Sequence, residues 1–354
     1  MMAYGTMPEE PIGLPSLVIP SVSLKIPPFL SDYNPVPLPW APREIERTLR
    51  VQADSLKIIH IHNLRTAFSV AWLLTAGRIK PRYNYKIVLT DHGSRFFPFP
   101  KIPLAMVDYY ATISQSSMAQ LQSLSSRPGV VLQPIFDPGL ALTHEPRSFE
   151  DRDIDIIFFG RIAPWKRPDL ILAIVKRLLQ LGFHQIRAVL AGAPISQSYL
   201  RALLQARVKL NLSSSVEIIL SPSEEIKVDL LRRSKFNLLM SGPVDTSGRK
   251  WPYPELAGTS IIEAAACGTP SLAMNIPGVS EQISNNKSGY LIELSTPEEE
   301  VKQACERLSA ALFNDKIWST MAQTARSSAL RRNHPAVVAT RLLDFLRSEG
   351  VGPR

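Results

Sequence analysis

The sequence predicts an α/β protein with two domains, each built on a parallel sheet with helices on both faces. Three observations support this fold class. Short apolar runs typical of buried strands alternate with segments whose apolar residues recur at helical spacing. Many of the expected strands end in glycine or polar residues, and doubly wound sheets bind their ligands at these carboxyl ends. A length of 354 residues is sufficient for two domains, each with its own core.

The alternation is clearest between residues 150 and 335. One expected helix there begins at Glu224 and carries apolar residues at helical spacing, at Ile226, Leu230 and Leu231. Apolar runs predict six strands in this region, at 154–159, 189–192, 216–220, 236–240, 271–274 and 289–292.

The region before residue 150 has a weaker pattern. Four strands are expected there, at 56–63, 85–90, 110–114 and 130–134. The first strand contains His60 and His62 near its end, and the second is followed by His92 and Gly93. A histidine alone is more often structural than catalytic, but its place beside a glycine at a strand end keeps both interpretations of His92 open.

Two carboxylates flank a glycine turn in the C-terminal half. Glu255 and Glu263 lie eight residues apart, and Gly258 precedes a short helix. The N–H groups near Thr259 and Ser260 would face outward at the positive end of the helix dipole, which suits a diphosphate. Glu263, about one turn into the helix, is suited to the hydroxyls of a ribose. The alternative is a capping box, in which Glu263 folds back onto a free N–H beside Ser260.

A second motif lies upstream. A buried apolar strand ends at Gly160, and Pro168 occupies the preferred first position of a helix. Arg161 and Lys166 would then lie beside a strand-to-helix turn, where both can reach a diphosphate. The alternative is that they are ordinary solvated cations.

Together these motifs resemble those of retaining GT-B glycosyltransferases, family 4-like, whose signature is E-x7-E. The resemblance covers residues 150–335 almost continuously. It implies two Rossmann-like domains facing a cleft, with Gly160, Arg161, Lys166, Gly258, Thr259, Ser260 and Glu263 binding the donor. It also implies that His92 and Glu255 orient the donor sugar, so that the catalytic group is His92, Arg161, Lys166 and Glu255. No metal or cofactor is expected, because the two cations and the helix face the diphosphate.

The chain departs from this family in two places. Ten prolines up to Pro42, with no strand-turn-helix unit before Leu56, predict an N-terminal domain that is truncated. The long loop from Gly242 to Pro254 carries Trp251 and Tyr253, which either cover the sugar or pack on the protein surface. The predicted division is a Pro-rich incomplete N-terminal segment (1–50), an acceptor-side Rossmann-like domain (51–145), a nucleotide-sugar-binding Rossmann-like domain (146–335) and a C-terminal helix (336–354).

Composition narrows the range of partners. The chain has 40 basic and 31 acidic residues, a net charge of +9, which anionic membranes, nucleic acid or anionic substrates could explain. No nucleic-acid module is evident, so nucleic acid is not expected as a partner. The segment Arg95–Lys101, with three phenylalanines between two cations, is the candidate for peripheral membrane contact; packing under the N-terminal domain is the alternative.

Other sequence features favour a cytoplasmic protein, with peripheral contact at the inner face of the membrane as an option. No apolar run reaches the length of a membrane span, and no cleavable signal is visible. Cys267 and Cys305 have neither a C-x-x-C pattern nor a His-rich context for a metal.

The sequence thus favours a retaining glycosyltransferase that moves a sugar from a nucleotide-diphosphate donor to a glycan or lipid-linked acceptor. The alternative is a catalytically impaired nucleotide-sugar-binding protein that lacks the first N-terminal unit. A dinucleotide-dependent oxidoreductase is disfavoured, because no G-x-G-x-x-G motif follows an expected strand.

Overall fold

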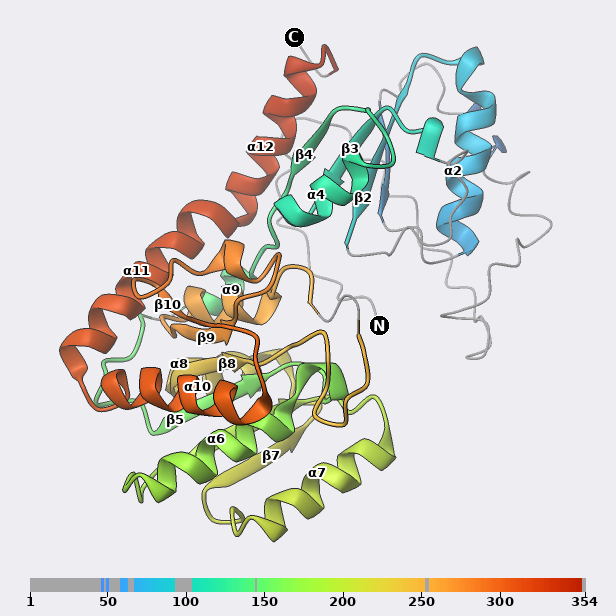
Figure 1. Cartoon of the computed structure of the whole chain (residues 1–354). Helices are drawn as coiled ribbons and strands as arrows, with labels where there is room; N and C mark the ends of the chain where they lie inside the picture. The colour runs from blue at the N-terminus through green and yellow to red at the C-terminus, as the bar shows by residue number, and fades with distance from the viewer. Residues whose placement is uncertain are drawn as a thin grey trace.

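The computed structural model describes residues 46–47, 49–50, 58–62, 67–92, 104–143, 145–251 and 255–351, with the main chain alone at 67–72 and 91. Most of the Pro-rich opening, Gly93, the segment Arg95–Lys101 and Tyr253 lie outside these ranges. The described chain forms two α/β domains (Figure 1).

The N-terminal domain is built on a four-stranded parallel sheet in the order β1-β2-β3-β4. Its core lies between this sheet and the neighbouring helices, and includes Leu73, Ile87, Leu89 and Tyr110. The elements are β1 (Ile58–His62), α2 (Ala67–Ile79), η2 (Lys80–Arg82), β2 (Lys86–Asp91), β3 (Tyr109–Thr112), α4 (Gln115–Gln122), β4 (Gly129–Val131) and α5 (Pro138–Ala141).

The C-terminal domain is built on a six-stranded parallel sheet in the order β10-β9-β8-β5-β6-β7. Its strands are β5 (Ile154–Phe159), β6 (Ala188–Gly192), β7 (Val216–Leu220), β8 (Ser234–Leu239), β9 (Ser271–Met274) and β10 (Gly289–Ile292). Its helices, together with the C-terminal helix of the chain, are η3 (Pro164–Lys166), α6 (Pro168–Gln180), α7 (Gln197–Lys209), α8 (Glu224–Arg233), α9 (Thr259–Ala266), η4 (Ser280–Gln282), α10 (Pro297–Ala311), α11 (Asp315–Asn333) and α12 (Pro335–Ser348).

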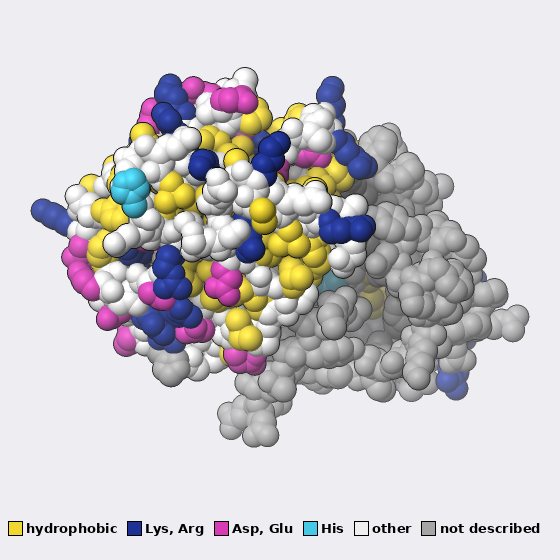
Figure 2. Space-filling model, turned by 90° about the horizontal axis from the view of Figure 1, so that it is seen from below, with side chains coloured by type: hydrophobic (Ala, Val, Ile, Leu, Met, Phe, Trp, Pro, Cys, Tyr) yellow, Lys and Arg dark blue, Asp and Glu magenta, His cyan; other side chains and the backbone are white. Residues whose placement is uncertain are grey.

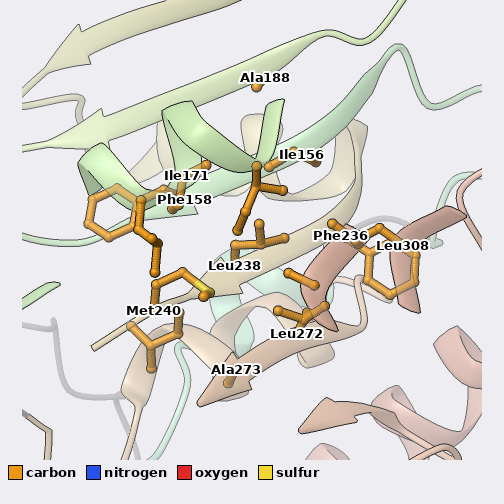
Figure 3. Close-up of a cluster of buried hydrophobic side chains, with 14 of the residues drawn as sticks. Ile156, Phe158, Ile171, Ala188, Phe236, Leu238, Met240, Leu272, Ala273 and Leu308 are labelled. Atoms are coloured by element: carbon orange, nitrogen blue, oxygen red, sulfur yellow. The ribbon is translucent and has the colours of Figure 1, made fainter. Parts of the chain in front are cut away.

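Burial on both faces explains why the central strands read as apolar runs. In β5 the first five residues are all buried, as expected for a parallel strand covered on each side. On one face Ile156, Phe158 and Phe236 pack with Ile171 of α6 and Leu308 of α10 (Figure 3). On the other face, strand residues pack against α8 and α9 in a second cluster.

The C-terminal helix α12 joins the two domains. It leaves the end of α11 and runs beside the N-terminal sheet (Figure 1). The ring of Phe345 lies edge-on to that of Tyr109, with centroids 5.7 Å apart. Leu346 and Val351 are buried in the same cluster with Val88. The last helix of the chain therefore contributes to the core of the first domain.

Candidate functional site

Two strand ends meet closely where the turn between β5 and α6 begins; we call this segment, residues 160–167, the diphosphate turn. The N–H of Gly160, directly after β5, donates to Ala191 O at 3.0 Å. A Cβ added at Gly192 would lie only 1.7 Å from Gly160 O, so this position requires glycine. The approach brings the chain after β5 to the carboxyl edge of the sheet, where Arg161 is exposed. The guanidinium carbon of Arg161 lies 5.4 Å from the centre of the Trp165 ring.

Lys166 and Glu255, both predicted as catalytic, form an ion pair. Lys166 ends the single turn η3, and the next residue, Arg167, has a left-handed φ of 48° that starts α6 in a new direction. The Lys166 ammonium binds Glu255 Oε2, with the two side chains only 13% and 14% exposed. Ser241 Oγ, after β8, also approaches Glu255 Oε2, at 3.5 Å. The structure thus unites residues 89 positions apart in sequence.

The glycine turn before α9 has the geometry expected for an anion site. Gly258 is the N-cap of α9, with a left-handed φ of 63° and no side-chain cap. An added Cβ would lie 2.8 Å from Ile261 Cδ1, so Gly258 is constrained by conformation and by space. Within the described part of the chain, the N–H groups of Thr259 and Ser260 have no acceptor. Free N–H groups at a helix N-terminus attract anions.

The capping-box alternative for Glu263 is wrong. Because Gly258 is the N-cap, Ser260 is already the second residue of α9, and Glu263 lies too far along the helix to close a box. Glu263 Oε1 instead accepts a hydrogen bond from Lys227 Nζ at 2.9 Å. Burial raises the pKa of Glu263 above its ordinary value, and the nearby Lys227 ammonium limits this rise.

Lys227 on α8 was not among the predicted site residues. It is buried, binds both Glu224 and Glu263, and lies 5.3 Å from the centre of the Phe159 ring. Burial lowers the pKa of Lys227, but the two carboxylates raise it by more, so the ammonium stays charged at neutral pH. The Glu224–Lys227 spacing of three was visible in the sequence; the contact with Glu263 depends on how α8 and α9 pack.

These contacts place the two predicted motifs at one edge of the sheet. Phe159 is the last residue of β5 and precedes Arg161 by two positions. Since Lys227 contacts both Phe159 and Glu263, Glu263 lies on the same side of the domain as the Arg161 turn.

Three histidines cluster at the carboxyl ends of β1 and β2. His62 Nδ1 lies 2.8 Å from His92 Nε2, and His60 Nε2 lies 2.6 Å from Thr90 Oγ1. The rings of His60 and His62 have centroids 4.1 Å apart. His92, the predicted sugar-facing residue, therefore belongs to a group whose other members were not predicted as site residues. Adjacent parallel strands with histidines near their ends are the signal that could have identified them.

All three histidines are neutral at neutral pH. Although His60 keeps exposed surface, the protein packed around its ring lowers its pKa to about 3, with smaller contributions from His62 and His92. Burial also lowers the pKa of His62 and of His92. A neutral pair satisfies the His62–His92 hydrogen bond, in which one ring nitrogen donates and the other accepts.

Glu281 links the C-terminal domain to the N-terminal one. Its Oε2 accepts from the N–H of Gln115 at 2.8 Å, and its Oε1 accepts from the N–H of Ser116 at 3.1 Å. These are the first two residues of α4, whose N-cap Ser114 binds the N–H of Ser117. A carboxylate from one domain thus completes a helix cap in the other.

Charge on the described surface is mixed. Figure 2 shows basic and acidic side chains interspersed over one face, in agreement with the spread of basic residues in the sequence. A cavity of about 830 Å³ between β10, α10 and α11 is lined by Lys287, Arg307 and Lys316 among others, and includes none of the predicted site residues.

The described ranges contain neither a metal-binding cluster nor a membrane-spanning helix. No group of three or more His, Cys, Asp or Glu side chains there could hold a metal ion. No described helix is long and apolar enough to cross a membrane. Cys267 and Cys305 are free, buried thiols, and burial raises the pKa of each to about 11.

Comparison with protein families identifies one match. The family described as "Glycosyl transferases group 1" matches residues 142–326. The D-inositol 3-phosphate glycosyltransferase of Rhodococcus jostii strain RHA1 is 28% identical over 149 residues, which cover 41% of this chain and 30% of the relative. The enzyme of the same name from Mycobacterium sp. strain KMS is 31% identical over 170 residues, 47% of this chain and 35% of the relative. The match spans about a third of the length of these curated relatives.

Solved structures share the two-domain architecture. A glycosyltransferase from Rickettsia africae ESF-5 superposes with a TM-score of 0.69 at 18% identity, covering 87% of this chain and 80% of that one. Anabaena HepE in complex with UDP and glucose superposes with a TM-score of 0.65 at 17% identity, covering 86% and 81%. The two domains therefore form a GT-B fold, as the sequence predicts.

Proposed function

Because this chain belongs to the group 1 glycosyl transferases, we propose that it is a retaining glycosyltransferase whose donor is a nucleotide-diphosphate sugar. The family match spans the C-terminal domain, which carries both donor motifs. The observation that carries the proposal is the arrangement at one edge of the six-stranded sheet. There the cation Arg161, the free N–H groups at the start of α9 and the carboxylate of Glu263 lie in the same region.

The leaving group is stabilised by positive partners. When the sugar leaves, negative charge develops on the diphosphate. Arg161 makes directional hydrogen bonds to its oxygens, and Lys166 acts as a compact point charge. The N–H groups of Thr259 and Ser260 add two neutral donors at the positive end of α9. Fixed donors of this kind stabilise the transition state more than the ground state, and thereby raise the rate.

The carboxylates hold the rest of the donor. Lys227 occupies Oε1 of Glu263, and Glu263 Oε2 has no partner among the described residues, so Oε2 can accept from a ribose hydroxyl. Glu255 and His92 orient the sugar from opposite domains. The His62–His92 hydrogen bond fixes the orientation of the His92 ring.

The donor and acceptor are proposed only by class. Anabaena HepE was solved with UDP and with UDP-glucose, which supports a nucleotide sugar as the donor. The acceptor is a glycan or a lipid-linked molecule, and the reaction uses neither a metal nor a cofactor. The curated relatives are named D-inositol 3-phosphate glycosyltransferases, and that name describes those enzymes.

Calorimetric titration tests the donor site. UDP, GDP and ADP are each titrated into the protein and into Arg161→Ala. We expect one of the three to bind the protein and to bind the variant more weakly. The anomeric configuration of the product, determined by NMR with the matching nucleotide sugar, tests retention. An inverted product would contradict the retaining mechanism, and failure of all three diphosphates to bind would contradict the donor site.

A second candidate function is binding of a nucleotide sugar without turnover. The Lys166–Glu255 ion pair favours it, because each partner neutralises a charge that catalysis would use. Breakdown of a bound nucleotide sugar in the presence of glycan and lipid acceptors separates the two functions: turnover supports the enzyme, and tight binding with no turnover supports the second candidate.

A further inference from the structure

The loop between β8 and Glu255 contains a short hairpin that packs on the diphosphate turn. We define the hairpin as residues 242–251. Val244 and Lys250 form an antiparallel bridge, and the N–H of Trp251 donates to Pro243 O at 2.6 Å. Gly248 supplies a left-handed residue near the tip, with a φ of 84°. These bonds fold a segment that the sequence presents as a loop into a defined unit.

Asp245 organises the hairpin from within. It is 6% exposed, and its Oδ1 accepts from the backbone N–H groups of Ser247 at 2.9 Å and of Arg249 at 3.0 Å. Its Oδ2 accepts from the indole N–H of Trp251 at 2.8 Å. Burial raises the pKa of Asp245, but hydrogen bonds from Ser247, Trp251 and Arg249 outweigh it and hold the pKa below its ordinary value. The Trp251 ring is therefore held by a carboxylate that stays ionised.

Trp251 contacts the diphosphate turn through Trp165. The centroids of the two rings are 4.7 Å apart, at an interplanar angle of 47°. The backbone adds a second contact, since the N–H of Gly242 donates to Trp165 O at 3.1 Å. A third contact joins Thr246 Oγ1 to Asp169 Oδ2 at the start of α6. The hairpin is thus attached at two points to the turn and at a third to the start of α6.

Trp165 in turn contacts Arg161. The guanidinium of Arg161 lies 5.4 Å from the centre of the Trp165 ring, within range of a cation–π contact. Within the described ranges, the Arg161 side chain makes this ring contact and has neither a hydrogen bond nor an ion pair. An arginine with so few contacts has many rotamers open to it, and fixing one of them on ligand binding costs entropy. The Trp165 ring reduces this cost only if the ring itself is held in place.

We propose that Trp251 is a positioning residue for the donor diphosphate: it fixes Trp165, which holds the guanidinium of Arg161 where the diphosphate binds. The inference rests on the proposed function, since it takes Arg161 as a diphosphate ligand. It adds a role for the hairpin, which lies outside both donor motifs. Trp251 then contributes to the affinity for the phosphates and does not contribute to the affinity for the nucleoside.

The alternative role for Trp251 is packing alone. In that case removal of the indole would loosen the domain edge and weaken all ligands together. Binding of a nucleoside and of its diphosphate, measured side by side, separates the two roles. A conservative ring replacement adds a second criterion, because phenylalanine keeps a ring against Trp165 and loses only the hydrogen bond to Asp245.

The experiment compares Trp251→Ala, Trp251→Phe and a matched control, Phe313→Leu. Phe313 stacks on Phe183 with centroids 4.9 Å apart, in the same domain and away from the diphosphate turn. The probes are UDP, GDP and ADP with their nucleosides, titrated by calorimetry. For the diphosphate that binds best, we expect Trp251→Ala to weaken binding about tenfold, by loss of Arg161 preorganisation. In Trp251→Ala the affinity for the nucleoside should change less than about twofold. Trp251→Phe should keep most of the diphosphate affinity of the unmodified protein. Phe313→Leu should change neither the nucleoside affinity nor the diphosphate affinity.

Three results would overturn the inference. The first is unchanged diphosphate affinity in Trp251→Ala when Arg161→Ala weakens it; in that case the proposed function stands. The second is an equal loss of nucleoside and diphosphate affinity. The third is failure of any diphosphate to bind the unmodified protein, which removes the proposed function as well. If Trp251→Ala does not fold, Trp251→Leu serves instead, since it keeps an apolar side chain and removes the ring that packs on Trp165; the same selective loss is expected.

Discussion

The ammonium group of Lys227 lies 2.9 Å from Oε1 of Glu263, in a contact between α8 and α9. A buried lysine needs a carboxylate partner, and a second one, Glu224, lies one helical turn away. The pairing holds the Glu263 carboxylate in a fixed position, on the same side of the domain as the end of β5. Its Oε2 has no partner among the described residues, and we propose that this oxygen accepts from a ribose hydroxyl.

Glu263→Gln should weaken binding of a nucleoside diphosphate more than tenfold, because a charge-assisted hydrogen bond to the ribose becomes a neutral one. The loss should extend to the bare nucleoside, which keeps the ribose. Calorimetry with the ribonucleotide and with its 2′-deoxy analogue measures the effect: the protein should prefer the ribonucleotide, and the variant should distinguish the two poorly.

Lys227 provides the control for this prediction. Glu263→Gln also leaves Lys227 with one carboxylate fewer, so a loss of stability is expected alongside the loss of affinity. The pair Lys227→Met and Lys227→Met/Glu263→Gln removes this complication. The double variant should again prefer the ribonucleotide over its 2′-deoxy analogue less strongly than Lys227→Met does. If the double variant keeps the full preference, Glu263 serves only to balance Lys227.

Arg161→Ala and Lys166→Ala should each weaken binding of a nucleoside diphosphate by about 1–3 kcal/mol, the usual size for hydrogen bonds to charged groups. Binding of the bare nucleoside should hardly change, since it has no phosphates. In an active enzyme, turnover should fall more than donor affinity, because the charge on the diphosphate grows as the sugar leaves. Calorimetry and steady-state rates measure the two effects.

The two cations differ in one respect that the structure reveals. Lys166→Ala leaves the largely buried Glu255 carboxylate without its cation, whereas Arg161→Ala leaves no carboxylate unpaired among the described residues. We therefore expect a loss of thermal stability for Lys166→Ala that Lys166→Ala/Glu255→Gln recovers. Parallel losses of nucleoside and diphosphate affinity in Arg161→Ala would mean that Arg161 supports the loop and does not contact the ligand.

The strands were the most predictable part of the structure. The predicted ranges 154–159, 216–220, 271–274 and 289–292 coincide with β5, β7, β9 and β10. These strands lie in a parallel sheet with helices on both faces, so their burial produces short apolar runs. In the N-terminal domain the predicted ends differ from the observed ones by up to three residues, as for 130–134 against Gly129–Val131.

The contacts within the site were less predictable. The resemblance to retaining GT-B glycosyltransferases implied that Lys166 and Glu255 share one site, but their direct ion pair depends on the left-handed turn at Arg167, a conformation that its sequence does not indicate. The capping-box interpretation was wrong because α9 begins at Thr259, directly after its N-cap Gly258. Ser260 therefore lies inside the helix and is not its N-cap. Lys227 was missed because its partner Glu263 comes from another helix.

Stability should fall as the pH drops below about 6.5, through the histidine group. In the folded protein the pKa of His60 is lowered to about 3, against 6.5 in the unfolded chain. Between these two values the unfolded chain binds more protons, so the free energy of unfolding decreases as the pH falls. The contribution of neutral His60 to the free energy of unfolding is complete above pH 6.5 and is lost progressively down to about pH 3.

Urea unfolding at a series of pH values measures this dependence. His60→Gln should have a shallower loss of stability over the same range, because glutamine does not titrate. His184→Gln is the matched control, since His184 lies on the C-terminal domain, outside the histidine group. An identical pH dependence for the protein and His60→Gln would show that other groups account for the acid loss.

Glu281→Ala should loosen the contact between the two domains. The change removes the acceptor for the first two N–H groups of α4, and with it a negative charge at the positive end of that helix. Loss of a helix cap costs about 0.5–2 kcal/mol, which should appear as a lower free energy of unfolding in urea. Small-angle scattering should show a larger radius of gyration, because Glu281 joins elements of different domains.

Glu298→Ala is the control for Glu281→Ala. Glu298 is an exposed glutamate in the first turn of α10, within one domain, so its removal also takes one negative charge from a helix N-terminus. It should change stability slightly and leave the radius of gyration unchanged. If both variants have the same radius of gyration, Glu281 caps α4 without restraining the relative position of the two domains. An expansion confined to Glu281→Ala would show that this carboxylate restrains the relative position of the two domains that hold His92 and Glu255.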